Sequence, residues 1–380
     1  MKKNLVLAAV VLAAMSSCSK DEVIEVNNGN AIAFRASVDK AISRGPVTNL
    51  ANLNVFNVTA IGNDKNYFTN LEVRSSNGGV EWKTASTYYW PSFDLAFFAY
   101  APQDLGNGQV TINDVKKKIT SFSPNQIVAE QKDLVIAYNT GNKANNESAG
   151  VALNFKHALS QIEVQAKCLN PNIKIEVLGV KVMNVARTAD FTFPESEATG
   201  TSYQLPRTQW DNYEGADQGN GYMVKGTNAV TLTENPQSIM MGTDNFMLIP
   251  QQLVGWEATS QQTGAYLSVL CRIYSKDGNN EVLLYPLATS SDKKEGKYGL
   301  SAVAINTEWL PGKKYTYTLT FCGDGSGAGR IDPNPDANDP TIDQTPVPNG
   351  KGGDLILGAP IKFTVQVDNW TPASVDINMN

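Results

Sequence analysis

Hydrophobic and polar residues alternate with a period of two along several stretches of the chain, and long helical periodicity does not recur. The first stretch covers residues 32–38. Its apolar face consists of Ile32, Phe34, Ala36 and Val38, and Ala33, Arg35 and Ser37 lie on the opposite face. Similar alternation covers 161–167, 314–321 and 361–367. Because successive side chains of a strand point to opposite sides of its sheet, the pattern predicts strands with one apolar and one polar face.

Strands of this kind are typical of antiparallel sheets that pack face to face. Turn signals such as Asn77-Gly78-Gly79, Asp277-Gly278 and Pro311-Gly312 separate the runs. The 380 residues are long for one domain and comfortable for two. The sequence therefore predicts an all-β fold with two antiparallel β-sandwich domains.

A short break at 168–172, between two strong strands, is the expected domain junction. It divides an N-terminal sandwich over 45–170 from a C-terminal sandwich over 171–380. Within the second domain, 323–353 is irregular and rich in Gly, Pro, Asp and Asn. So long a loop inside a compact domain is usually functional or disordered.

The first 18 residues have the layout of an export signal. Lys2 and Lys3 precede an apolar run over 5–15, and Ser17 stands before Cys18. As a helix, about eleven residues extend roughly 16 Å, too short for a hydrocarbon core of roughly 30 Å. The junction resembles a bacterial lipobox, which implies cleavage between Ser17 and Cys18 and lipidation of the Cys18 thiol. The alternative is an ordinary secretory leader with an incidental cysteine.

Residues 1–17 are thus expected to be a lipoprotein signal peptide, and 18–44 a lipidated tether with the first strand. The start of the tether, Ser19-Lys20-Asp21-Glu22, resembles the tag that directs lipoproteins of the Bacteroidota to the outer face of the cell. The resemblance implies a precursor anchored in the outer membrane through its lipid and displayed at the cell surface.

Charge argues against nucleic acid and anionic membrane surfaces as partners. The formal net charge is −6, and loss of Lys2 and Lys3 with the leader takes it to −8. The longest basic run is 116–118.

Besides Cys18, the chain contains Cys168, Cys271 and Cys322, at spacings that match neither a metal site nor a CxxC motif. One disulfide with a free thiol and three buried thiols both remain open.

Residues that could support catalysis are few. His157 is the single histidine, so a zinc site is not expected, and no Gly-x-Ser-x-Gly elbow opens a helix. We interpret His157 as a structural residue and expect neither enzymatic activity nor a cofactor.

Oxygen ligands for calcium occur at Asp332, Asp336, Asn338 and Asp339, but without EF-hand spacing, so a solvated acidic loop is the preferred interpretation.

Aromatic residues gather at 88–91 and again over 93–100. An exposed cluster could stack on sugar rings. Strand periodicity places Phe97, Ala99 and Ala101 on one face of a strand and Phe98 and Tyr100 on the other, which favours a role in the core for most of them. Trp256 is a candidate for an exposed tryptophan.

An ordered set of short motifs resembles the fimbrillin family, the subunits of type V pili. The motifs cover nearly the whole mature chain, and they are Tyr88-Tyr89-Trp90-Pro91, residues 97–102, 133–137, 154–160, 248–251, 309–317, and 361–365 with Trp370. The resemblance implies two transthyretin-like β-sandwiches, which agrees with the alternation.

The resemblance also implies a route of assembly. In fimbrillins an arginine-specific protease cuts after the first strand, that strand leaves, and a strand of a neighbouring subunit fills the exposed groove. Arg44-Gly45 lies in a polar turn after the strand at 32–38, and is the candidate cleavage site. Ile32, Phe34, Ala36 and Val38 would belong to the displaced strand. The alternative is that Arg44 is simply an exposed turn residue. Arg35 is a poorer candidate because it lies inside the strand.

Two segments near the C-terminus could provide the donor strand. Val375, Ile377 and Met379 alternate with polar residues in the tail, and 361–367 alternates upstream. The second segment is expected to close its own sandwich. If the tail cannot donate, a tip or accessory role follows.

These observations predict a structural and adhesive pilus subunit that is not an enzyme. Its expected partners are other pilus subunits, an arginine-specific protease, the outer membrane through the lipid, and a host or bacterial surface ligand. The alternative is a lipid-anchored surface protein that does not polymerise and binds glycans or host proteins. A surface glycosidase is poorly supported.

Overall fold

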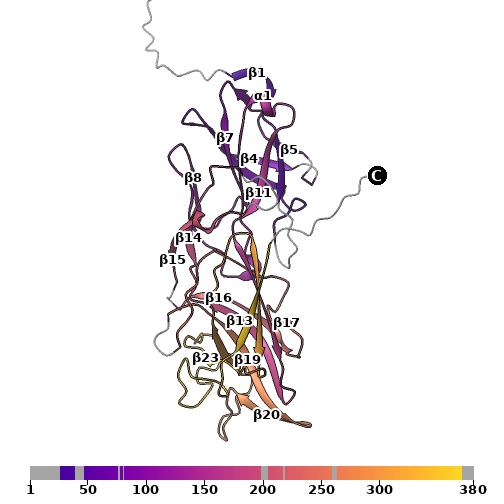
Figure 1. Ribbon diagram of the computed structural model, residues 1–380, viewed down its shortest axis with the longest axis vertical. Coiled ribbons are helices and arrows are strands. Elements are labelled where there is room, and N and C mark those ends of the chain that lie inside the picture. Colours follow the sequence, from indigo (N-terminus) through magenta and orange to yellow (C-terminus); the bar gives the residue numbers. More distant parts are fainter. Residues whose placement is uncertain are drawn as a thin grey trace, which may run out of the picture.

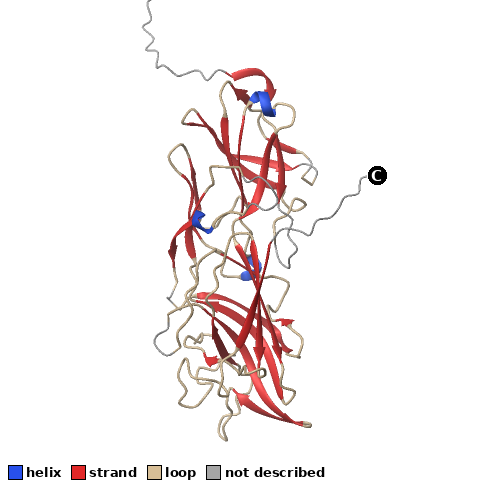
Figure 2. Cartoon of the chain, in the orientation of Figure 1, coloured by secondary structure: helices blue, strands red, loops and turns tan. Residues whose placement is uncertain are grey.

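A computed structural model describes residues 26–38, 47–75, 78–79, 81–197, 204–216, 219–258 and 263–369. The molecule is elongated, with the N-terminal strands at one end and the C-terminal strands at the other (Figure 1). Strands dominate, as Figure 2 shows, so the all-β prediction is confirmed. Among the described residues, no helix combines the length and the apolar character needed to cross a membrane.

The N-terminal strands form a closed barrel rather than an open sandwich. Around the barrel the order is β10 (Val135–Gly141), β11 (Val151–His157), β2 (Phe34–Val38), β5 (Trp82–Thr84), β4 (Lys65–Ser75), β3 (Val55–Gly62) and β7 (Leu95–Ala101). The ladder closes because β2 pairs with β11 on one side and with β5 on the other. One end carries the pair β1 (Val26–Ala31) and β6 (Tyr89–Pro91), with the short helix α1 (Lys143–Asn146) nearby (Figure 1).

Strand β7 separates two cores. Phe97, Ala99 and Ala101 pack inside the barrel, and Phe98 and Tyr100 pack in a second core on its outer side. Both faces are buried, as the sequence predicted for these aromatic residues. The inner core also holds Trp90, while Tyr89 beside it is 42% exposed. Trp256, the candidate for exposure, is buried against Tyr266, so that expectation was wrong.

The C-terminal strands form two sheets around a common core. The first sheet runs β17 (Gln237–Ser238), β12 (Ser160–Cys168), β22 (Lys313–Phe321) and β24 (Lys362–Asn369), with β18 (Phe246–Leu248) also on β12. The second runs β16 (Gly221–Thr231), β13 (Ile173–Met183), β19 (Tyr266–Asp277), β21 (Gly299–Ala304) and β23 (Arg330–Ile331), with β20 (Asn280–Tyr285) on β19.

Strand β12 belongs with the C-terminal sheets, although it precedes the junction expected at 168–172. It pairs in parallel with β22 over Gln161–Cys168. The first part of its polar face is buried rather than exposed, with Gln161 at 0% and Glu163 at 5% exposure, while Gln165 and Lys167 are half-buried. An ion pair of 2.6 Å with the Lys314 ammonium group offsets the cost of burying the Glu163 carboxylate. In β22, by contrast, the predicted alternation of buried and half-buried residues is observed.

A third sheet joins the two ends of the molecule at its waist (Figure 1). It consists of β8 (Gln109–Ile112) and β9 (Lys117–Phe122) from the N-terminal half, and β14 (Thr188–Thr192) and β15 (Trp210–Glu214) from the C-terminal half. Single turns of 3-10 helix at Val128–Glu130 and Arg207–Gln209 flank it. Phe191 and Trp210 pack with Phe98 of the barrel and Met247 of β18 in one core. Because this core includes residues of both halves, the molecule is one continuous body.

The irregular segment over 323–353 packs on the C-terminal sheets. Three lysines pair with its carboxylates: Lys181 with Asp332 at 2.9 Å, Lys225 with Asp339 at 2.6 Å and Lys294 with Asp343 at 2.8 Å. Ile342 adds an apolar contact with Leu270 and Leu300. Ion pairs and this apolar contact therefore hold the segment against the C-terminal sheets.

The Lys181–Asp332 pair is the most deeply buried of the three, with side-chain exposures of 5% and 1%. Substitution Lys181→Met leaves the Asp332 carboxylate buried without its countercharge. We expect a loss of about 3–5 kcal/mol in the free energy of unfolding, measured by urea denaturation. The double variant Lys181→Met/Asp332→Asn should recover part of the loss. An unchanged midpoint for Lys181→Met would contradict this account.

Candidate assembly site

Strand β2 fills the wall of the N-terminal barrel with one apolar face. Phe34 and Val38 are buried, as is Ile32 just before the strand, and Ala36 is half-buried, while Arg35 and Ser37 on the other face are exposed. The Phe34 ring makes edge-on contacts with Phe56 and Phe97, at centroid distances of 6.3 and 5.9 Å. Burial of such large apolar side chains stabilises the barrel by about 2 kcal/mol each.

The backbone of β2 is paired unevenly on its two sides. It pairs in parallel with Val151–Phe155 of β11 at all five positions, but with β5 at only one, Phe34 opposite Trp82. Strand β11 in turn meets β10 at two positions only, through Lys156 and His157. Without β2, Val151–Phe155 would thus be an open strand edge above an apolar core, which is a template for another strand.

Shortly after β2, the chain contacts the body of the protein again at Val47 and Thr48. Val47 is buried in the core at the waist, and the Thr48 N–H donates to Asp133 Oδ2 at 3.0 Å. The same oxygen lies 2.7 Å from Nδ1 of the buried His157. His157 is a structural residue, as predicted, and it holds the carboxylate that anchors Thr48. Sequence reasoning did not connect these residues, because contacts so distant in sequence leave no local pattern.

Strand β24 is the edge of its sheet among the described residues. It pairs antiparallel with β22 from Lys362 opposite Thr320 to Asn369 opposite Lys313. The expected alternation is visible but shallow: Phe363 and Val365 are half-buried, and Val367 is 50% exposed. The segment at 361–367 thus completes this chain's own sheet.

The sequence over residues 36–332 matches the family model described as fimbrillin-like, which is most of the 380 residues. The chain belongs to the fimbrillin-like family. Membership of the family makes it a structural protein and not an enzyme. A comparison with curated protein sequences finds no match.

Several solved structures are similar to this fimbrillin-like chain, and each is described provisionally as a cell adhesion protein. One from Bacteroides eggerthii has 13% identity and a TM-score of 0.46, and the match covers 91% of this chain and 98% of that one. One from Bacteroides ovatus has 13% identity and a TM-score of 0.44, with 90% and 99% covered. One from Parabacteroides distasonis has 9% identity and a TM-score of 0.46, with 91% and 99% covered.

Several predicted site residues of the fimbrillin-like chain lie outside the described residues. They are Ser17 and Cys18 of the leader, Arg44 and Gly45 of the candidate cleavage site, and Val375, Ile377 and Met379 of the candidate donor strand. The four residues of the candidate displaced strand are described, and their side chains share one face.

The calcium candidates do not converge on one point. The Asp332 carboxylate pairs with Lys181 and accepts the Tyr266 hydroxyl, while Asp339 pairs with Lys225. Asp336 is exposed and accepts the Asn338 N–H. Hydrogen bonds and the charge of Lys225 lower the pKa of Asp339 although burial opposes the shift. Three or more acidic, His or Cys residues gathered around one point do not occur among the described residues.

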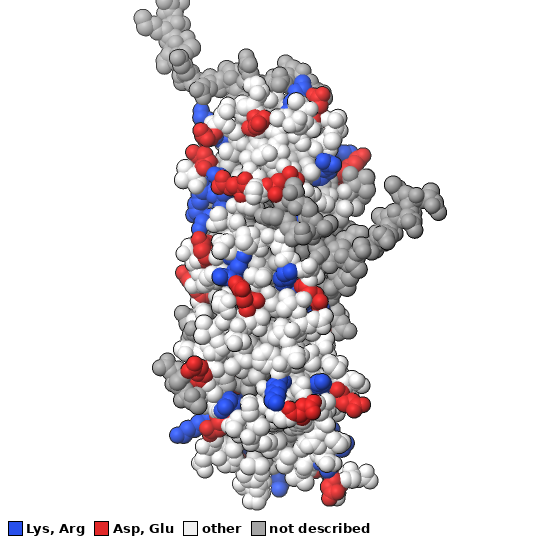
Figure 3. All heavy atoms as spheres, viewed as in Figure 1, with Lys and Arg blue, Asp and Glu red and all other residues white. Residues whose placement is uncertain are grey.

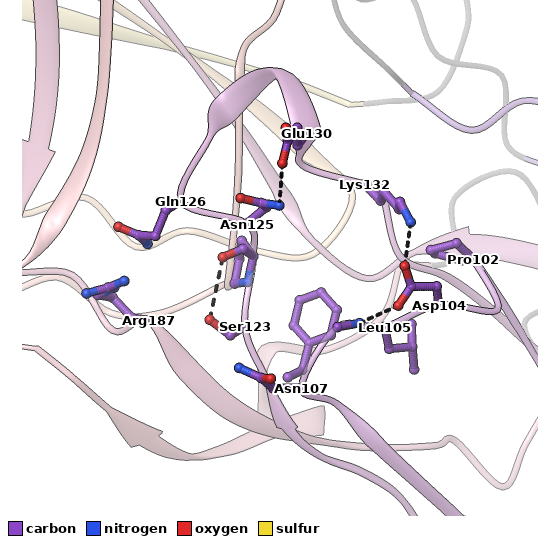
Figure 4. Close-up of a pocket in the computed structure, with 13 residues that line it drawn as sticks. Pro102, Asp104, Leu105, Asn107, Ser123, Asn125, Gln126, Glu130, Lys132 and Arg187 are labelled. Atoms are coloured by element: carbon purple, nitrogen blue, oxygen red, sulfur yellow. Dashed lines mark hydrogen bonds and ion pairs between the residues drawn. The ribbon is translucent and has the colours of Figure 1, made fainter.

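A cavity of about 360 Å3 opens at the waist of the fimbrillin-like protein (Figure 4). On one side Asp104 pairs with Lys132 at 2.9 Å, and Arg187 lies on the opposite side. Glu130 accepts the Asn125 amide at 3.0 Å. The lining combines apolar side chains such as Leu105 and Phe122 with amide and charged groups, and both of its carboxylates, Asp104 and Glu130, are already engaged.

Charge is mixed over the surface. On the face in Figure 3, Lys and Arg side chains are interspersed with Asp and Glu. This distribution and the net charge of −6 give no attraction for a polyanion.

The account of β2 predicts a large effect for one side chain and almost none for its neighbour. Phe34→Ala removes the ring between Phe56 and Phe97, so the free energy of unfolding should fall by about 3–4 kcal/mol. Arg35→Ala, on the exposed face, should change it by less than about 0.5 kcal/mol. Urea denaturation of both variants measures the difference. Equal stability of the two variants would show that β2 does not seat in the barrel.

Proposed function

We propose that this fimbrillin-like protein is an exported subunit of an adhesive surface fibre that assembles by strand exchange. The family supports an adhesive surface or pilus protein. In this proposal β2 leaves the precursor, and a strand of a neighbouring subunit takes its place against β11. The observation that carries the proposal is the one-sided pairing of β2, which fills an apolar groove and hydrogen-bonds mainly to one neighbour.

The position of Arg44 supports cleavage between two separately held parts of the chain. Upstream, Val38 is the last residue of β2; downstream, Val47 and Thr48 are fixed to the body by the core and by Asp133. A cut between Arg44 and Gly45 would free β2 without releasing the anchor at Thr48. An arginine-specific protease is the proposed partner for this step. Arg35 is unsuited to such a cut because it lies within the paired strand.

The same cut would separate the subunit from its lipid. We propose that Cys18 is lipidated and holds the precursor at the outer membrane until cleavage. The domains follow this scheme: leader 1–17, removable segment 18–44, and the assembled body from 45 onward, with its halves joined at the waist.

For the donor strand we propose the tail after Asn369. Strand β24 already belongs to the sheet of its own subunit, which leaves Val375, Ile377 and Met379 as the apolar positions available to a neighbour. Alternate side chains of a donor strand enter pockets while its backbone pairs with the open edge. A chain whose tail does not donate would occupy the tip of a fibre.

Arg44→Ala should block assembly and leave the fold intact, because β2 then stays in its groove. The measurement is fibre formation on cells fed a palmitate analogue. Wild-type fibre subunits should carry no label, whereas Arg44→Ala should remain labelled and unassembled. Arg35→Ala is the matched control and should assemble normally, and Cys18→Ala should take up no label. Normal fibres from Arg44→Ala would refute the cleavage site, and label on Cys18→Ala would refute lipidation.

Ile377→Asp should weaken polymerisation, since a carboxylate cannot enter an apolar groove without a large desolvation cost. Asn378→Asp, on the opposite face of the same alternation, should have little effect. Polymer length on SDS gels without heating distinguishes the two variants. Full-length ladders from Ile377→Asp would exclude the tail as donor and favour a tip role.

A further inference from the structure

Two cysteines meet at one end of the C-terminal sheet. Cys168 is the last residue of β12, and Cys322 directly follows β22. The two strands are parallel neighbours, with Cys168 opposite Phe321, and the Leu169 N–H donates to the Phe321 carbonyl oxygen at 3.1 Å. In register, therefore, the two cysteines are one residue apart on adjacent strands.

The backbone at Cys322 brings both thiols to the same side of the sheet. Simple alternation would direct Cys322 away from the core, since Phe321 points into it. Cys322 instead has a φ of 48°, in the left-handed region, and its side chain packs against the same core as Cys168. A turn from Gly323 to Ser326 follows, and the Cys322 N–H donates to the Gly327 carbonyl oxygen at 3.0 Å. A strained, non-glycine conformation thus places one thiol beside the other.

The thiols are close enough to influence each other's ionisation. The pKa of Cys168 is lowered to about 7, chiefly because the Cys322 thiol donates a hydrogen bond to its sulfur, while burial opposes the shift. The pKa of Cys322 is raised by the same interaction and by burial. Cys271 lies in the same core but is fully buried, and burial alone raises its pKa.

We propose that Cys168 and Cys322 form a disulfide in the exported protein, and that Cys271 remains a thiol. The bond would tie the end of β12 to the end of β22, next to the place where β24 begins its pairing with Thr320. The oxidant is a disulfide of the exported compartment, carried by a thiol–disulfide oxidoreductase or a small molecule. An oxidising location is supplied by the surface role proposed above, but the bond itself can be tested without it.

The exchange balances in two steps. The Cys168 thiolate takes the proton of the more exposed Cys322 along the hydrogen bond between them, as the Cys322 sulfur attacks the oxidant's disulfide; one oxidant sulfur leaves as a thiolate and is protonated by solvent. Cys168 then gives its proton to solvent, and its thiolate attacks the Cys322 sulfur of the mixed disulfide. This forms the Cys168–Cys322 bond and releases the second oxidant thiolate, which is protonated in turn. The two cysteines lose two electrons together, and the oxidant's disulfide is reduced to two thiols.

The bond has a measurable effect on stability. It closes a chain segment of more than a hundred residues, and long closed loops restrict the unfolded chain most. Oxidation should raise the midpoint of thermal unfolding by roughly 5–10 °C, and reduction should reverse the rise.

The test uses the full chain incubated in a glutathione redox buffer and then digested without reduction. We expect a peptide that links Cys168 to Cys322, about 2 Da lighter than the sum of the two reduced peptides, and alkylation of Cys271 only after unfolding. Cys271→Ala is the matched control and should keep the linked peptide and the thermal shift. Cys168→Ala and Cys322→Ala should lose both.

Comparison of the oxidised and reduced wild-type chain keeps the test independent of any folding defect in the variants. Alkylation of both Cys168 and Cys322 in the oxidised chain, or a bond that includes Cys271, would overturn the proposal. Fibre assembly does not enter these readouts, so failure of the bond and failure of strand exchange are distinguishable.

Discussion

The N-terminal barrel depends on one five-residue strand. Without β2, the backbone of Val151–Phe155 has no partner on that side, and the core around Phe56 and Phe97 opens to water. Open strand edges and uncovered apolar cores are both unfavourable, so a strand must occupy this position. This requirement does not specify whether the strand belongs to the same chain or to another one. A strand of the same chain and one of another chain can satisfy it equally well, and the proposed assembly relies on this equivalence.

In the proposed assembly the remainder of the molecule would keep its contacts while that position changes occupant. The waist sheet takes strands from both halves, and its core joins the barrel to the C-terminal sheets. The segment over 323–353 is fixed by Lys181, Lys225 and Lys294. Asp133 holds Thr48 next to the barrel independently of β2. The proposed Cys168–Cys322 bond would add a covalent link at the end of the C-terminal sheet.

Local pattern predicted several of the strands, and contacts between residues far apart in the sequence account for much of what it did not predict. Alternation identified the two faces of β2, β7 and β22, because each strand's neighbours bury alternate residues. It did not reveal that Glu163 on the polar face of β12 is buried, since Lys314, which neutralises Glu163, lies far along the chain. The closure of the barrel by β2 depends on partners as distant as Trp82 and Val151, and no local signal encodes it.

The most direct test of strand exchange treats the purified, folded precursor with an arginine-specific protease. Intact mass then identifies the cut, and SDS gels without heating reveal resistant polymers. The account predicts a single cut after Arg44, loss of the segment that contains β2, and ladders of subunits. A precursor that stays uncut and monomeric, or one that is cut but retains β2 in its barrel, would contradict it.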